Sequence, residues 1–202
     1  MVVRKGDRRV QRTEQLLRGA LMSLIQEKGF ETLSVQDIID RANVGRATFY
    51  AHFENKDDLL MSGLEEFRTS IKAHQRRLQQ QATGPQDQAF LVSREVFVHA
   101  HAHRDVFRAM VGKQSGTVVQ RLVQKILLEL VREDVKAAMA RAGDGAVPLE
   151  AVAQFIAAGF WGLLAWWVDG RPRLSVDEID AAFRRMAIPA LRAARSPVES
   201  NR

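Results

Sequence analysis

Cysteine is absent from this chain. Without a thiol the protein can form no disulfide bridge, no thiolate metal site and no cysteine nucleophile. A chain without cysteine suits a reducing compartment, and the N-terminal stretch MVVRKGDRRV lacks the apolar run of a secretory signal. We therefore expect a cytoplasmic protein.

Strand patterns are also lacking. Apolar residues recur at helical spacing along the chain, and almost no segment alternates between apolar and polar residues as a half-buried strand does. The sequence therefore predicts an all-α fold without internal repeats.

Long hydrophobic runs are limited to one segment, Ala151 to Val168, where Gln154 is the only polar residue. Its length is close to the minimum for a membrane span. The run is rich in alanine and glycine, acids flank it at Glu150 and Asp169, and no second span exists. We expect a buried helix, with no membrane partner.

Recognisable catalytic patterns are missing as well. No paired carboxylates stand in an evident motif, and no phosphate-binding loop is present. An all-helical enzyme is therefore the least favoured of the functions considered, and we expect no cofactor.

Positive charge, in contrast, is in excess. The net charge is +6, and residues 4–12 carry five basic side chains against one acid. Such an arm favours an acidic partner such as nucleic acid or an anionic membrane. A solvated tail is the alternative for the same residues.

Capping signals divide the N-terminal region into short helices. Gly29 ends the first helix, and Ser34 with Asp37 forms a capping box that starts the second. Asn43 suits the left-handed position after a helix end, and Gly45 is an acceptable N-cap for a third helix that starts at Arg46.

Longer helices follow an N-cap at Asn55. We expect them over residues 56–81, 86–103, 105–112, 117–141, 149–169 and 176–195. Gly84-Pro85, Gly112, Gly143-Asp144-Gly145 and Pro172 mark the breaks, and Pro189 should kink the last helix or end it early. We divide the chain into residues 1–58 and 59–202, with the boundary inside the fourth helix and no flexible linker.

The third helix has the pattern of a helix that enters a DNA groove. Phe49 and Phe53 fall on one side and predict its buried face, while Ala47 lies opposite. Polar residues form the two flanks between these sides, and small residues at the tip allow close approach to base edges. The predicted DNA contacts are Gln36, Arg46, Ala47, Thr48, Tyr50, His52 and Lys56, with Arg46 suited to guanine and Lys56 to phosphate.

The stretch QRTEQLLRGALMSLIQEKGFETLSVQDIIDRANVGRATFYAHFENKDDLL resembles the DNA-binding domain of TetR/AcrR-type transcriptional regulators. It contains the T-x-Y-x-H-F-x-x-K core of that family. It departs from the family at Asn43, where glycine is usual, and at Gly45, where serine is common. The resemblance implies that Thr48, Tyr50, His52 and Lys56 contact the DNA backbone. It also implies that Gln36, Arg46 and Ala47 read bases.

The family resemblance further implies a helix-turn-helix domain fused through a shared helix to a helical bundle that dimerises. It extends more loosely to residues 101–116 and 157–183. The implied function is a homodimeric repressor that binds a near-palindromic double-stranded DNA operator and is released by a small-molecule effector. The alternative is a ligand-independent DNA-binding or adaptor protein whose C-terminal half only dimerises.

Two sets of residues are candidates for these C-terminal roles. Small and apolar residues suggest a dimer interface at Phe155, Ala158, Gly162, Ala165, Ile179, Phe183 and Met186. Methionine and aromatic residues could line an effector pocket or form plain core: Met61, Leu64, Phe67, Phe90, Phe97, Phe107, Met110, Met139 and Trp161. The cluster His99, His101 and His103 invites a metal site, but a solvated helix face is the more common explanation, and we expect no metal.

Overall fold

The computed structural model describes residues 5–81, 90, 92–111, 117–140, 146–170 and 174–195, and within them it contains helices and no strand. The expected all-α fold is therefore confirmed for the described residues. The helices are α1 (Lys5–Lys28), α2 (Val35–Ala42), α3 (Arg46–Tyr50), α4 (Lys56–Gln81), α5 (Ser93–Ala102), α6 (Arg104–Val111), α7 (Thr117–Met139), α8 (Leu149–Asp169) and α9 (Val176–Arg195).

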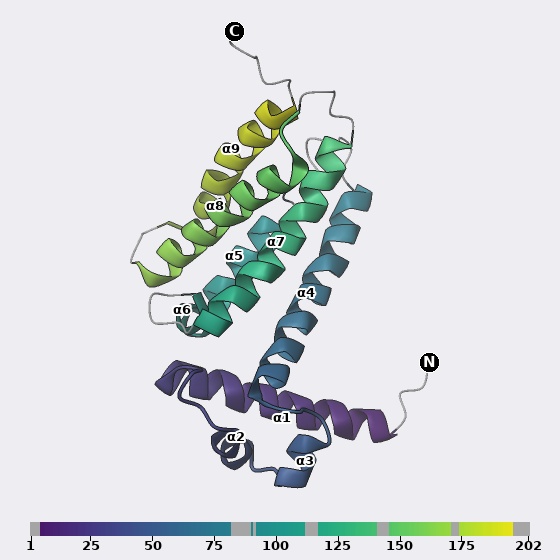
Figure 1. Cartoon of the computed structure of the whole chain (residues 1–202), viewed down its shortest axis with the longest axis vertical. Helices are drawn as coiled ribbons and strands as arrows, with labels where there is room; N and C mark the ends of the chain where they lie inside the picture. Colours follow the sequence, from purple (N-terminus) through teal and green to yellow (C-terminus); the bar gives the residue numbers. More distant parts are fainter. Residues whose placement is uncertain are drawn as a thin grey trace.

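The helices form a small base and a larger upper bundle (Figure 1). Helix α1 lies across the base with α2 and α3 beneath it, and α4 rises from the base beside α7. Helices α5 to α9 make up the rest of the bundle. Helix α4 is unbroken from Lys56 to Gln81, so one continuous helix joins the base to the upper bundle.

Local capping explains where the helices of the base end. Gly29 follows α1 with φ of 76°, and Asn43 follows α2 with φ of 52°, both in the left-handed region. The capping box before α2 is complete, since the amide of Asp37 donates to Ser34 Oγ and the amide of Ser34 donates to the Asp37 carboxylate. The Asn55 side chain accepts from the amide of Asp58 at 2.9 Å and so caps α4.

Two segments differ from the expectations. Residues 5–12 belong to α1, so this part of the basic arm is helical, and residues 8–12 in it are exposed to solvent. Helix α5 begins at Ser93 rather than earlier. Helix α9 extends from Val176 to Arg195 as expected and contains Pro189. The breaks predicted at residues 84–85, 112, 143–145 and 172, and the start of a helix at 86, lie outside the described residues.

Helix α8 packs between α7 and α9 in the upper bundle (Figure 1). It is the one helix of the described chain that is long and apolar enough to cross a membrane, a property shared by core helices. Its buried face includes Ile156, Phe160 and Trp167, and the Trp167 indole donates to the carbonyl of Leu174 at 3.0 Å. The burial of this face places α8 in the core of the bundle, as expected.

Candidate nucleic-acid interface and adjoining groove

The turn between α2 and α3 is closed by backbone hydrogen bonds. The amide of Val44 donates to the carbonyl of Ile39 at 3.2 Å, and Gly45 is the N-cap of α3 without a side-chain contact. Helix α3 ends at Tyr50, although the predicted pattern treats residues up to Phe53 as helical. The amide of Phe53 still donates to the carbonyl of Phe49 at 2.9 Å. Phe53 therefore stays on the side that the helical pattern predicts.

One face of α3 is exposed in the way that the sequence predicts. Phe49 is fully buried, while Arg46, Ala47 and Tyr50 are exposed. The guanidinium of Arg46 lies 5.7 Å from the centre of the Tyr50 ring, so the two side chains stack along one flank. Gln36 of α2 is also exposed, and its amide donates to Asp40 at 2.8 Å.

The opposite flank of α3 is less open than expected. Thr48 is half-buried, and the His52 side chain is only 14% exposed. His52 Nδ1 lies 3.5 Å from a carboxylate oxygen of Glu14 on α1. A carboxylate at Nδ1 fixes the imidazole plane and leaves Nε2 as the nitrogen that can face another partner.

Lys56 does not present a free ammonium group. Its Nζ donates to the carbonyls of Phe30, Glu31 and Leu33 at 3.0, 3.3 and 2.8 Å, and it lies 4.7 Å from the centre of the Phe30 ring. An ammonium group has three donors, and all three are used. In this structure Lys56 therefore holds the start of α4 against the turn between α1 and α2, and its contact with phosphate stays a prediction.

Ion pairs hold α2 against α1. The Arg41 guanidinium makes two 2.7 Å contacts with Glu27, and Lys28 lies 2.9 Å from Asp37. Hydrogen bonds from Ser34, with help from Lys28, hold the pKa of Asp37 well below its usual range. These contacts fix α2 as a support for α3.

A groove of about 670 Å³ lies above the base, and we call it the central groove. It is lined by residues of α1, α4, α5, α6, α7 and α8, and most of them are apolar. Of the residues predicted to line a pocket, four line the central groove: Leu64, Phe67, Phe107 and Met110.

The other predicted pocket residues lie elsewhere. Phe97 is fully buried against Phe160 and Trp167, and Trp161 lines a shallow surface groove between α7 and α8. Met61 and Met139 line none of the described cavities. These assignments fail because methionine and aromatic residues at helical spacing do not distinguish core from cavity wall.

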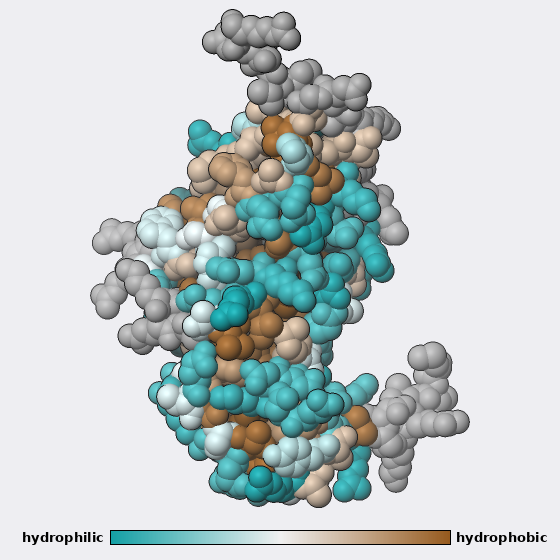
Figure 2. Space-filling view, viewed as in Figure 1, coloured by the Kyte–Doolittle hydropathy of each residue, from teal (hydrophilic) through white to brown (hydrophobic). Residues whose placement is uncertain are grey.

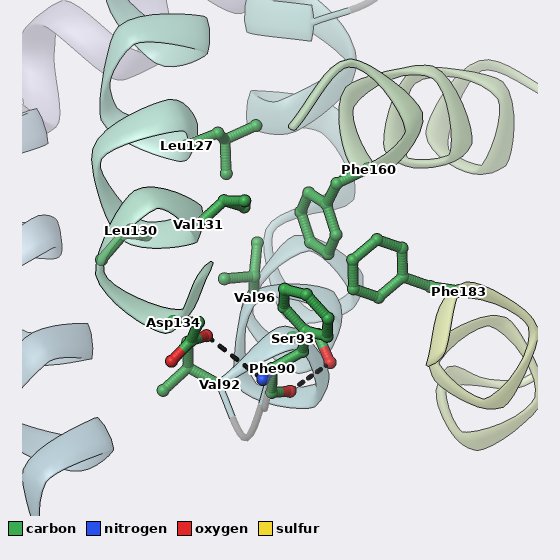
Figure 3. A pocket seen from close by; sticks show the side chains of 10 residues that line it. All are labelled: Phe90, Val92, Ser93, Val96, Leu127, Leu130, Val131, Asp134, Phe160 and Phe183. Carbon is green, nitrogen blue, oxygen red and sulfur yellow. Dashed lines mark hydrogen bonds between the residues drawn. The ribbon is translucent and has the colours of Figure 1, made fainter. Parts of the chain in front are cut away.

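Phe90 lines a separate cavity of about 20 Å³, space for about one water molecule, with Phe160 and Phe183 (Figure 3). Asp134 at its edge is 4% exposed, and its carboxylate accepts from Gln75 at 2.5 Å and from the amide of Phe90 at 3.2 Å. Burial raises the pKa of Asp134 to about 7. This buried carboxyl joins α4 to α7 and was not predicted from the sequence.

The histidines of α5 join an aromatic cluster in the central groove. The His99 ring lies 4.7 Å from Phe67, 5.6 Å from Phe107 and 4.6 Å from His103, between ring centres. Burial, and secondly the charge of His103, lowers the pKa of His99. His101 contacts Trp167 instead, and the described residues contain no group of three side chains that could hold a metal ion.

The predicted dimer residues divide into two groups. Ile179 and Phe183 are buried within the chain itself, so their assignment to an interface is wrong. Phe155 and Met186 are 70% and 57% exposed, and Ala158 and Gly162 are also exposed beside Phe155 on α8, whereas Ala165 is half-buried. Trp166, which is 52% exposed on α8, was missed because an aromatic residue in an apolar helix is indistinguishable from core by pattern alone.

The contacts of Glu14 with His52 and of Arg18 with α4 are not predictable from the sequence. Both belong to α1, and Arg18 reaches toward α4, where its Nε donates to Ser62 Oγ at 3.2 Å. Arg18 also lines the central groove. Contacts between separate helices such as these leave no local pattern in a single sequence.

Comparisons with known proteins agree with this geometry. Residues 17–62 match the model of the bacterial regulatory proteins of the tetR family. The HTH-type transcriptional regulator YxbF of Bacillus subtilis is 36% identical over 69 residues, which are 34% of this chain and 18% of that protein. The chain thus spans less than a fifth of the length of that relative. The HTH-type transcriptional repressor KstR2 of Mycolicibacterium smegmatis is 22% identical over 186 residues, 85% of this chain and 86% of the repressor.

Solved structures share the fold over nearly the whole chain. A TetR-family regulator of Syntrophomonas wolfei matches with a TM-score of 0.73 and 20% identity, covering 95% of this chain and 99% of that chain. The TetR-family repressor FadR of Thermus thermophilus, solved with lauroyl-CoA, matches with a TM-score of 0.63 and 17% identity, covering 94% and 98%. Residues 17–62 therefore form a DNA-binding domain of the tetR family, and the chain as a whole has the fold of TetR-family transcriptional regulators.

Proposed function

We propose that this regulator is a cytoplasmic homodimer that represses transcription from a near-palindromic operator and is released by a small molecule bound in the central groove. The observation that carries the proposal is the position of α4. This helix lines the central groove with Leu64 and Phe67, and its first residue is clamped to the base that carries α3. An occupant of the groove therefore acts on a helix that continues directly into the DNA-binding domain.

The exposed face of α3 supports contact with DNA. Arg46 suits bidentate bonding to guanine, and Ala47 leaves space for a thymine methyl group. Tyr50 stands beside Arg46 with its ring stacked on the guanidinium, which suits a phosphate contact at the edge of the groove. The basic residues at the start of α1, such as Arg8 and Arg9, are exposed and add attraction for the DNA backbone.

The exposed apolar face of α8 and α9 supports dimerisation. Phe155, Trp166 and Met186 are each more than half exposed, and large apolar side chains exposed together mark interaction sites. A twofold dimer through this face would carry two copies of α3, which matches a two-part operator.

The central groove favours a ligand-responsive regulator over one that only dimerises. Its volume of about 670 Å³ is in the range of small-molecule sites, and its walls are apolar with a few polar groups at the edges. Repression is supported by the KstR2 relative, whose similarity extends over 85% of this chain.

The test begins with selection of bound DNA from a random pool, followed by a screen for compounds that release the selected operator. Lauroyl-CoA is one probe for that screen. Arg46→Ala should weaken operator binding by about 1–3 kcal/mol and relax the preference at one base position. Arg76→Ala, which removes the same charge from the exposed surface of α4, is the matched control. Failure to select any operator, or an unchanged base preference in Arg46→Ala, would contradict DNA reading by α3.

Repression is tested separately with a reporter gene behind the selected operator. Deletion of the regulator should raise reporter expression, and a releasing compound should do the same in cells that contain the protein. A fall in expression on deletion would make the protein an activator, and operator binding that no compound alters would favour the ligand-independent alternative.

A further inference from the structure

A chain of polar contacts connects the central groove to the end of α3. At one end, His52 follows α3 and its Nδ1 lies 3.5 Å from Glu14. Glu14 lies 3.3 Å from Arg18 Nη2 one helical turn further along α1. Arg18 in turn donates to Ser62 at 3.2 Å and is paired with Glu66, both on α4.

The far end of this chain lies in the groove wall. Arg18 and Glu66 both line the central groove, and so does Gly63, which lies between Ser62 and Glu66 on α4. A Cβ atom added at Gly63 would lie 3.8 Å from Arg18 Cδ. A group placed at this end of the groove therefore meets the Arg18 side chain directly.

We propose that Arg18 is the positioning residue through which the central groove controls α3: an occupant at the Gly63 end displaces the Arg18 guanidinium from Glu14, and Glu14 then no longer holds His52 in its DNA-binding orientation. The inference rests on the proposed function, since it presumes that occupancy of the groove changes operator binding.

The geometry makes Arg18 suited to this role. Its side chain is 21% exposed, and its single guanidinium is shared among a serine and two glutamates. A guanidinium makes its bonds in a rigid planar fork, so it cannot move to avoid an occupant without losing at least one partner. Glu14 has Arg18 and His52 as its described partners, and loss of Arg18 leaves its carboxylate with the imidazole alone.

The effect at α3 follows from the position of His52. Its ring lies 6.2 Å from Phe53, which packs 6.1 Å from the buried Phe49 of α3. The His52 side chain is largely enclosed, so a change at Glu14 alters which way Nε2 faces rather than being absorbed by solvent. This path of contacts runs through side chains of α1. It is separate from the hydrogen bonds by which Lys56 joins α4 to the α1–α2 turn.

The absence of cysteine allows a test that adds bulk to the folded protein. In Gly63→Cys the new thiol is unique, and it faces Arg18 in the open groove. The purified full-length protein is labelled with benzyl methanethiosulfonate, and affinity for the selected operator is measured before labelling, after labelling, and after removal of the label by a reductant.

We expect the unlabelled variant to bind operator within about twofold of wild type, the labelled protein to bind at least tenfold more weakly, and the reductant to restore binding. In the Arg18→Gln, Gly63→Cys double variant the same label should not weaken operator binding further, because the contact between Arg18 and Glu14 is already absent. Glu14→Gln alone should reproduce most of the loss. The His52 imidazole resonances in an NMR spectrum should shift with the label in the single variant and stay in place in the double variant.

The proposed role of Arg18 would be overturned if labelling weakened operator binding equally with and without Arg18, or if the His52 resonances did not move. Those results are distinct from a failure of the proposed function, in which wild-type protein itself selects no operator. Because the label is added after folding, a folding defect of a bulky substitution cannot produce the expected result. The unlabelled variant serves as its own control for stability.

Discussion

Lys56 shows how a single charged residue in a DNA-binding motif can act inside the protein. Its three hydrogen bonds hold carbonyls of the α1–α2 turn at the start of α4. Lys56→Met keeps the aliphatic stem over Phe30 and removes the donors, so it should lower the free energy of unfolding by about 1–3 kcal/mol. Urea unfolding measures this loss, and the salt dependence of operator binding should change little. A normal stability with a reduced salt slope would instead make Lys56 a phosphate contact.

Asp134 adds a pH dependence to stability. Its pKa is raised to about 7 in the folded protein because the carboxyl is buried, against 3.8 when exposed. The folded state therefore holds a proton that the unfolded state releases between about pH 4 and pH 7. Stability should fall as pH rises through that window, by at most a few kcal/mol. Asp134→Asn cannot ionise, so the difference in unfolding free energy between wild type and variant should change from pH 5 to pH 8. A constant difference would show that Asp134 ionises normally.

At the scale of one element, α3 is five residues long and depends on its cap. Gly45 has φ of −73° and ψ of 150°, which any residue adopts, and a Cβ there would lie 3.7 Å from Thr48 Oγ1, an ordinary contact. Gly45→Ser should therefore be accepted, raise stability by a few tenths of a kcal/mol, and tighten operator binding by adding a hydroxyl near the DNA backbone. Operator affinity is measured for Gly45→Ser and for Gly45→Ala. Their difference gives the effect of the hydroxyl, because both variants replace the glycine. Equal affinities of the two variants would contradict a phosphate contact at this position.

Elements whose signals are local were predictable, and those decided by packing were not. The Ser34 capping box, the left-handed Asn43 and the ends of α4, α8 and α9 follow from residues a few positions apart, and the structure has them as predicted. Phe183 has the pattern of an interface residue, yet it lies in the core. His52 has the pattern of a phosphate contact, and the sequence does not predict that Glu14 of α1 lies against its Nδ1. Their surroundings come from helices far away in sequence, which periodicity does not describe.

At the scale of the whole molecule, the base is largely covered by hydrophilic residues in the view of Figure 2, and large apolar side chains are exposed on α8 and α9. The face formed by Phe155, Trp166 and Met186 has no described cover within the chain, because these side chains are 70%, 52% and 57% exposed. If two copies of the chain bury this face across a twofold axis, each substitution is present twice in the interface.

Phe155→Glu should therefore break the dimer. Burial of a phenylalanine stabilises by roughly 2 kcal/mol, and its loss from both subunits would weaken dimerisation by roughly 4 kcal/mol, or about a thousandfold. Val98→Glu, on α5 and 36% exposed, introduces the same charge outside this face and is the matched control. Sedimentation equilibrium should find Phe155→Glu monomeric at concentrations where wild type and Val98→Glu are dimers. Because each copy still carries an intact α3, the monomer should bind half an operator as wild type does, but it should bind the palindrome no more tightly than half an operator. A dimeric Phe155→Glu protein would place the interface on another surface.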